Sequence, residues 1–268
     1  MGHSKSMLTY PGGNLRLFVE QALGEDARVV PSEGQAHYLL TVMRAVPGDH
    51  VRLFNGRQGE WLARIADVSK RSCSLLCERQ LMAQAPVPDL WLAFAPIKKT
   101  PADYVVQKAT ELGVRVLLPT MTRRTIVTRV NMERMRANAT EAAEQSDRLS
   151  VPEVRAPQSL SALLSQWPGE RTLIFCDEAG DAVPIADALA NVAGKACGVL
   201  TGPEGGFDPG ERESIRACPG MVAVTLGPRI LRADTAALAA LAVWQALKGD
   251  WRRLVPEKGE DYIADTRR

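Results

Sequence analysis

The sequence predicts a small β-rich module followed by an α/β domain with a parallel sheet. Three observations support this prediction. Short alternating apolar runs dominate residues 15–79, prolines crowd residues 84–88, and after them apolar strands alternate with helices. Such alternation implies a parallel sheet covered by helices on both faces. We therefore expect domains at residues 1–83 and 84–250, followed by a polar tail at 251–268.

The composition is that of an ordinary globular protein. The chain has 268 residues, enough for two domains, and 46% of them are hydrophobic. Its five cysteines are scattered and odd in number, which favours reduced thiols over a disulfide framework or a zinc site. The first residues form no apolar signal core, and no apolar run reaches the ~18 residues of a membrane span. We expect a cytoplasmic protein.

The net charge of +2 is too small to indicate a nucleic-acid partner by itself. Residues 84–130, however, hold seven basic and three acidic side chains. This local excess fits a polyanion-binding surface. On composition alone, a solvated basic face without a ligand is the favoured alternative, because runs of charge are usually just that.

The amino-terminal module begins with a short strand at residues 15–19 and another at 28–30. Ser32 and Gln35 have the spacing of a capping box, which opens a helix through about Arg44. Asn55-Gly56 then joins two alternating runs, 51–54 and 61–65, in a hairpin, and a strand follows at 73–77. This pattern predicts a β-barrel-like module with one helix, a type of module that often binds RNA.

The α/β domain is predicted from its strands and helix starts. Thr100 with Pro101, Asn131, and Asp208 with Pro209 mark helix starts. Helices are expected at 100–112, 131–145, 160–167, from 208, and at 234–248. Strands are expected at 90–95, 114–118, 173–176, 198–200 and 221–225.

The last helix, residues 234–248, is apolar almost all round. A helix of this kind is buried on every side. Contact with its own sheet and with a second subunit would satisfy it, so we expect a homodimer.

Two turns follow the last two predicted strands, Leu-Thr-Gly-Pro-Glu-Gly-Gly-Phe at 200–207 and Leu-Gly-Pro-Arg-Ile-Leu-Arg-Ala-Asp-Thr at 226–235. Glycine tolerates positive φ and allows a ligand close to the backbone. Turns on neighbouring parallel strands would frame a small-molecule pocket at the carboxyl edge of the sheet. Two tight turns without a ligand remain the alternative.

Several familiar sites are missing from the α/β domain. It contains no phosphate-binding P-loop and no Gly-x-Gly-x-x-Gly after its first strand. The three histidines, His3, His37 and His50, lie outside it, which excludes a serine–histidine triad or histidine metal site there. Glu204, Arg229, Arg232 and Asp234 remain near the turns. Arg232 suits a phosphate or an oxygen gaining charge, unless it forms a salt bridge with Asp234 or Glu204.

The two turns strongly resemble those of the bacterial 16S ribosomal RNA uracil-N3 methyltransferases of the SPOUT superfamily. Supporting matches lie at 107–114, at 144–146 with Arg148, at 151–153, and at Arg44 with 47–49. The resemblance covers about residues 15–248. It implies a PUA-like RNA-binding domain, a parallel sheet with a deep carboxyl-terminal trefoil knot, bound S-adenosylmethionine, no metal, and an obligate homodimer. The implied substrate is uridine 1498 of 16S rRNA, free or in the small ribosomal subunit, and the product is 3-methyluridine.

The resemblance also implies residue roles. Arg232 would orient the uracil and stabilise its charge, while the base that removes the N3 proton stays unassigned, with Glu204 and Glu144 as candidates. The expected cofactor-binding residues are Leu200, Thr201, Gly202, Gly205, Gly206, Leu226, Gly227, Ile230 and Leu231. The expected RNA-binding residues are Arg16, Arg44, Lys98, Lys108, Arg123 and Arg124.

Two alternatives stay open at this point. A ribose 2′-O-methyltransferase with a related fold would act on a hydroxyl, and analysis of methylated nucleosides distinguishes it. A non-catalytic RNA-binding assembly factor would use the barrel-like module alone and would bind no cofactor. The sequence does not determine the order of cofactor and RNA binding or the role of the tail.

Overall fold

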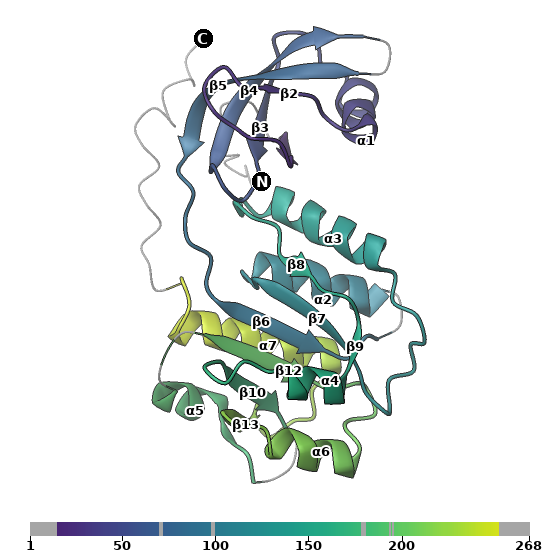
Figure 1. Cartoon of the computed structure of the whole chain (residues 1–268), viewed down its shortest axis with the longest axis vertical. Helices are drawn as coiled ribbons and strands as arrows, with labels where there is room; N and C mark the ends of the chain where they lie inside the picture. The colour runs from purple at the N-terminus through teal and green to yellow at the C-terminus, as the bar shows by residue number, and fades with distance from the viewer. Residues whose placement is uncertain are drawn as a thin grey trace, which may run out of the picture. The chain divides into compact units, whose positions relative to one another are not determined.

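The computed structural model describes residues 15–69, 72–97, 100–177, 181–192, 194 and 196–251 (Figure 1). The chain divides into two compact units between Pro86 and Val87. No helix in the described part of the chain is long and apolar enough to cross a membrane.

The amino-terminal unit contains a five-stranded sheet of order β1-β3-β4-β5-β2. β1 runs parallel to β3, whereas the other neighbours are antiparallel. The expected barrel-like module is thus a mixed sheet, and no strand pairing closes it among the described residues. Its strands are β1 Arg16–Phe18, β2 Arg28–Val29, β3 His50–Phe54, β4 Glu60–Val68 and β5 Cys73–Met82.

The helix of this unit is shorter than predicted. Ser32 and Gln35 form the predicted capping box and start α1, Glu33–His37. The chain then widens into one π-helical stretch, η1 Tyr38–Val42. Arg44 follows with a positive φ of 55°, which a helix does not accommodate. The predicted end at Arg44 is therefore about two residues too late.

The predicted hairpin is formed by β3 and β4, but its loop is longer than two residues. The side-chain oxygen of Asn55 accepts hydrogen bonds from the backbone N–H groups of Arg57 and Gln58, both 3.0 Å away. Asparagine commonly stabilises loops in this way. The Asn-Gly pair therefore opens a loop that returns to the sheet at Glu60.

A buried ion cluster joins the first strands of this sheet. The Glu60 carboxylate accepts hydrogen bonds from Arg16 and from Arg52, and all three side chains are at most 5% exposed. The Arg16 guanidinium also lies 3.8 Å from the centroid of the Phe54 ring. The prediction that Arg16 binds RNA is therefore wrong, because its buried guanidinium cannot reach a phosphate in solution.

The carboxyl-terminal unit contains the predicted parallel sheet. Its strand order is β11-β13-β10-β12-β6-β7-β8, with β9 also paired to β7, and every pair is parallel. β8, β9 and β11 have only two residues each and were not predicted. The strands are β6 Leu90–Phe94, β7 Val116–Met121, β8 Glu153–Val154, β9 Gln158–Ser159, β10 Thr172–Cys176, β11 Val183–Pro184, β12 Cys197–Thr201 and β13 Met221–Thr225.

Helices cover both faces of this sheet, and Figure 1 shows α4 and α7 on opposite sides of it. Side chains alternate between two cores, so Leu92 packs with α2, α3, α5 and α7, whereas Ala93 packs with α4 and α6. Asn131 and Asp208 cap α3 and α6 as predicted. The helices are α2 Thr100–Glu111, α3 Met132–Gln145, α4 Leu160–Ser165, α5 Ile185–Asn191, α6 Pro209–Arg216 and α7 Ala233–Leu247.

The last helix, α7, buries only one face within a single chain. Ala237, Leu241 and Trp244 are at most 1% exposed, whereas Leu247 on another face is 37% exposed. The chain alone therefore does not bury this helix on every side, and the predicted second subunit stays a prediction.

Candidate functional site

A cavity of about 630 Å³ lies where β10, β12 and β13 end. This is the carboxyl edge of a parallel sheet, where open α/β folds place their ligands. Both predicted glycine–proline turns line the cavity, and the end of β10 adds a third wall. The lining segments are 176–177, 201–204, 206–207 and 224–233, with Arg124, Pro209, Arg212 and Ala236.

The first turn needs glycine at two positions for different reasons. Gly206 has a φ of +67°, and its N–H donates to the carbonyl of Pro203 at 2.9 Å. A Cβ on Gly202 would lie 2.7 Å from the Phe207 ring. That ring meets Phe175 edge-on, with centroids 5.3 Å apart. The turn is thereby anchored to the core beneath the sheet.

The second turn has an internal hydrogen bond. Gly227 has a φ of +107°, and its N–H donates to the hydroxyl of Thr225 at 3.2 Å. The loop then leads to Arg232 at the N-cap position of α7, where the side chain makes no capping hydrogen bond. Ile230 is 87% exposed, which is unusual for isoleucine and leaves an apolar group beside the cavity.

Asp177 follows β10 and pairs with two arginines of α6, of which Arg212 lines the cavity with it. Its carboxylate is 2% exposed and lies 3.0 Å from Arg212 and 2.7 Å from Arg216. The Nε of Arg212 is buried without a hydrogen-bond partner. Sequence reasoning missed Asp177 and Arg212. The available signal was that Asp177 comes directly after a predicted strand, at the same sheet edge as the two turns.

Cys176 also lines the cavity, but its thiol is unreactive. Burial raises the pKa of its thiol to about 12. The group therefore stays protonated at neutral pH and is not a nucleophile, because the reactive form of cysteine is the thiolate.

Most of the predicted cofactor-binding residues line the cavity, and two do not. Leu200 is fully buried, and its side chain packs in the core with α4 and α6. The carbonyl of Gly205 accepts a hydrogen bond from Arg124 at 2.8 Å. The predicted residues that line the cavity are Thr201, Gly202, Gly206, Leu226, Gly227, Ile230 and Leu231.

The two candidate catalytic residues both reach the cavity. Arg232 and Glu204 are exposed and line it from opposite turns. Among the described residues, neither has an ion pair, so the expected alternative salt bridge of Arg232 with Asp234 or Glu204 does not form. Glu144 lies on α3 and is not among the residues that line this cavity.

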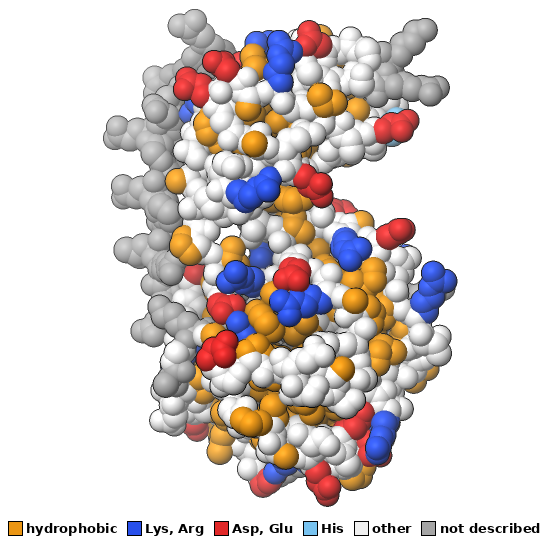
Figure 2. Space-filling view, viewed as in Figure 1, with side chains coloured by type: hydrophobic (Ala, Val, Ile, Leu, Met, Phe, Trp, Pro, Cys, Tyr) orange, Lys and Arg blue, Asp and Glu red, His pale blue; other side chains and the backbone are white. Residues whose placement is uncertain are grey.

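The predicted RNA-binding residues Arg123, Arg124 and Lys108 of the carboxyl-terminal unit differ in their hydrogen-bond and ion-pair partners. Arg123 is 68% exposed and pairs with Asp208 at 2.6 Å, while Arg124 lines the cavity. The ammonium group of Lys108 donates hydrogen bonds to both carboxylate oxygens of Glu111, at 2.7 and 2.9 Å. In the carboxyl-terminal unit, the face shown in Figure 2 intersperses acidic and basic side chains and carries no single basic patch.

The remaining two predicted RNA-binding residues lie elsewhere. Arg44 is exposed in the amino-terminal unit, and Lys98 lies outside the described residues. No group of three or more potential metal ligands occurs in the described part of the chain. The cavity thus offers glycine backbone, apolar side chains and an arginine with no carboxylate partner. This combination suits an organic ligand that presents developing negative charge.

Two family models match this chain. The model described as "RNA methyltransferase domain" matches residues 83–245, and the one described as "RNA methyltransferase PUA domain" matches residues 32–76. The first match contains every segment that lines the cavity.

Curated relatives and solved structures are similar over most of the chain. "Ribosomal RNA small subunit methyltransferase E" of Rickettsia conorii is 32% identical, over 85% of this chain and 93% of the relative. The Bacillus subtilis protein of that name is 30% identical, over 81% and 90%. The Neisseria gonorrhoeae protein of that name, in a crystal structure bound to S-adenosyl methionine, has a TM-score of 0.80 at 28% identity, over 88% and 99%. A putative Legionella pneumophila methyltransferase with bound SAM has a TM-score of 0.78 at 26% identity, over 87% and 97%.

Proposed function

Because the chain belongs to the RNA methyltransferase family, we propose that it transfers a methyl group from S-adenosylmethionine to N3 of a uracil in 16S ribosomal RNA. The observation that carries this proposal is the cavity framed by the two glycine–proline turns at the ends of β12 and β13. By resemblance, the target is uridine 1498 and the product is 3-methyluridine.

The cavity fits this cofactor in size and lining. Its volume of about 630 Å³ is within the range of pockets that enclose an organic cofactor. Gly227 leaves room for the ligand beside the backbone, because a Cβ there would meet nothing within 4 Å, and Leu226 and Leu231 supply apolar contact. These residues and Thr201, Gly206 and Ile230 would hold the cofactor. S-adenosylmethionine supplies an electrophilic sulfonium methyl group, so the protein contributes mainly alignment with the uracil nitrogen.

Arg232 is proposed to act on the uracil. Loss of the N3 proton places negative charge on the base, which a fixed guanidinium stabilises. Arg232 is suited to this role because it lines the cavity and no carboxylate among the described residues pairs with it. The target base would have to leave its stack for N3 to reach the cavity.

The proton acceptor remains a choice between candidates. Glu204 lines the cavity, is exposed, and makes no hydrogen bond with another described residue. It is therefore the better placed candidate within one chain. Glu144, on α3, would need another element or another subunit to bring it to the cofactor.

The fold details implied by the resemblance are part of the same proposal. A trefoil knot is implied by the resemblance, and it would involve the segment from β13 to α7, which packs on β12 and α2. A homodimer is supported by the half-exposed apolar faces of α7. The module at residues 1–83 would bind RNA, and residues 84–250 would form the methyltransferase domain.

Methyl transfer in vitro tests the proposal. The purified chain is incubated with methyl-labelled S-adenosylmethionine and either naked 16S rRNA or small ribosomal subunits, and the RNA is digested to nucleosides. We expect labelled 3-methyluridine. Label only in 2′-O-methylated nucleosides would replace the proposal with ribose methylation, and saturable RNA binding without cofactor binding would favour a non-catalytic role.

A further inference from the structure

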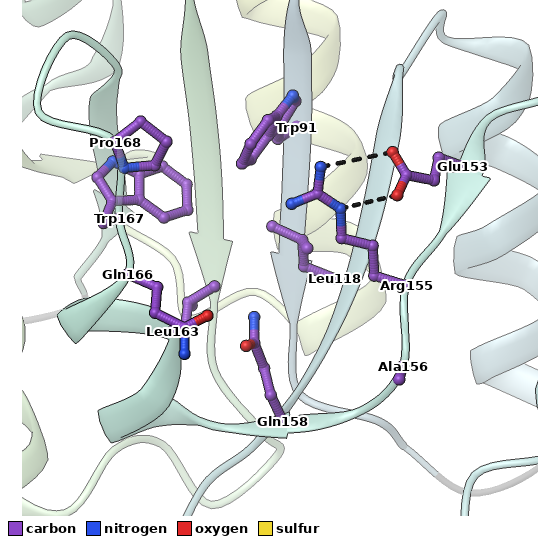
Figure 3. A pocket seen from close by; sticks show the side chains of 10 residues that line it. All are labelled: Trp91, Leu118, Glu153, Arg155, Ala156, Gln158, Leu163, Gln166, Trp167 and Pro168. Carbon is purple, nitrogen blue, oxygen red and sulfur yellow. Dashed lines mark hydrogen bonds and ion pairs between the residues drawn. The ribbon is translucent and has the colours of Figure 1, made fainter.

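A second cavity, of about 400 Å³, lies in the carboxyl-terminal unit away from the glycine–proline turns (Figure 3). It opens on the sheet face that carries α4, beside Trp91 near the start of β6 and Trp167 before β10. None of the residues that line it also lines the proposed cofactor cavity. The established family relationship leaves it without a role.

Trp91 is held as a rigid platform in this cavity. The buried guanidinium of Arg171 lies 3.8 Å from the centroid of the Trp91 ring and is fixed by the Asp89 carboxylate at 2.7 Å. The Trp167 ring meets Trp91 edge-on, with centroids 5.9 Å apart. Trp167 can take this position only because residue 198 is glycine, where a Cβ would lie 2.3 Å from the ring. The two indoles are therefore positioned before any ligand arrives.

The cavity also contains polar groups that the protein leaves unused. Figure 3 shows the Gln158 amide pointing into the space between Arg155 and Trp167. Arg155 lies 4.6 Å from the centroid of the Trp91 ring and uses Nε and Nη2 on Glu153, which leaves Nη1 available.

We propose that this cavity binds a nucleobase. Indole rings and a guanidinium plane are the groups on which proteins stack unpaired bases. A glutamine amide offers both a donor and an acceptor to the edge of a base, and Nη1 of Arg155 adds a donor. The volume admits one base and excludes a duplex. This inference rests on the proposed action on RNA only for the source of the base, an unpaired nucleotide of the rRNA.

Binding to the purified full chain tests the proposal, with UMP, CMP, AMP, GMP and a mixed-sequence single-stranded hexaribonucleotide as probes. Arg155→Gln and Gln158→Leu remove polar groups of the cavity without touching the core. Arg136→Gln on α3 is the matched control, because it removes the same charge from an exposed side chain elsewhere. Tryptophan fluorescence and calorimetry should show saturable binding that weakens about tenfold in each cavity variant and stays unchanged in the control. A saturating amount of S-adenosylmethionine should not displace the probe.

The outcomes separate the possible sources of the base and the two proposals. Binding of the hexanucleotide alone identifies an RNA base as the ligand, and equal affinity for a mononucleotide identifies a free nucleotide; both support the site. No saturable binding of any probe, equal weakening by Arg136→Gln, or displacement by S-adenosylmethionine overturns it. Methyl transfer by the wild-type chain is measured separately, so its absence would refute the proposed function while probe binding still decides this inference.

Discussion

Arginine is used in opposite ways in two clusters of this molecule. In the amino-terminal unit, Arg16 and Arg52 share Glu60, and all three side chains are almost fully buried. Beside the proposed cofactor cavity, Asp177 is equally buried, but its partners Arg212 and Arg216 are 35% and 33% exposed.

The difference shows what makes an arginine side chain accessible to a ligand. A buried arginine that shares a buried carboxylate stabilises or specifies the fold and presents almost no surface to solvent. Arg212 is partly exposed and lines the cavity. Arg232 also lines the cavity, and no carboxylate in the described part of the chain pairs with it. Pairing and burial, more than charge, therefore decide which arginines are accessible to a ligand here.

The largest expected effect comes from removing the shared carboxylate of the buried cluster. Glu60→Gln removes the carboxylate charge that two buried guanidiniums share, which typically costs about 3–5 kcal/mol. Urea unfolding of the full chain should show this loss as a lower transition midpoint. The matched control is Glu78→Gln, whose partners His50 and Arg64 are 37% and 39% exposed and whose loss should cost about 1 kcal/mol or less. Equal effects of the two substitutions would show that burial does not separate the clusters.

The next effect concerns Arg232, which lines the cavity. Arg232→Ala should lower kcat for methyl transfer by about 10²–10³-fold, because removing one group that stabilises transition-state charge has this magnitude. Cofactor affinity, measured by calorimetry, should change little. Arg136→Ala on α3 should leave both quantities unaltered. A loss of cofactor affinity equal to the loss of kcat would show that Arg232 binds the cofactor and does not act on the uracil.

A smaller effect is expected from the backbone of the second turn. Gly227→Ala places a Cβ at a φ of +107° and should cost about 1–3 kcal/mol of strain in the bound geometry. Calorimetry should then give a roughly tenfold weaker affinity for S-adenosylmethionine. Gly34→Ala is the control, because its Cβ would meet nothing within 4 Å and its φ is not positive. Unchanged affinity in Gly227→Ala would remove this turn from the cofactor site.

The smallest effect should come from the basic side chains outside the cavity centre. Arg124→Gln should weaken RNA binding a few-fold and lower the slope of log affinity against log salt by about 1, as for one lost phosphate contact. Lys108→Gln should change the slope less, because Glu111 already neutralises its ammonium group. A larger slope change for Lys108→Gln than for Arg124→Gln would contradict the proposal that Arg124 is the more accessible of the two to RNA phosphates.

Local sequence patterns predicted most helices and strands. They failed where an element is too short to show a pattern. Asn131 and Asp208 start helices because capping depends on neighbouring residues only. β8, β9 and β11 have two residues each, too few for a visible alternation.

The parts of the candidate site that consist of a local turn could be predicted from the sequence. Both glycine–proline turns were found from sequence and line one cavity. Asp177 was missed because its importance depends on where β10 ends in the sheet, between β13 and β12. Arg16 was assigned to RNA because its charge is visible in the sequence, whereas Glu60, 44 residues further on, is not visible as its partner.

Nucleoside mass spectrometry of 16S rRNA tests the proposed methyl transfer most directly. Cells that lack this gene are compared with cells that carry a wild-type copy or an Arg232→Ala copy. We predict that 3-methyluridine disappears in the deletion, returns with the wild-type copy, and stays absent or nearly so with Arg232→Ala. Unchanged 3-methyluridine in the deletion strain would contradict uracil N3 of 16S rRNA as the target.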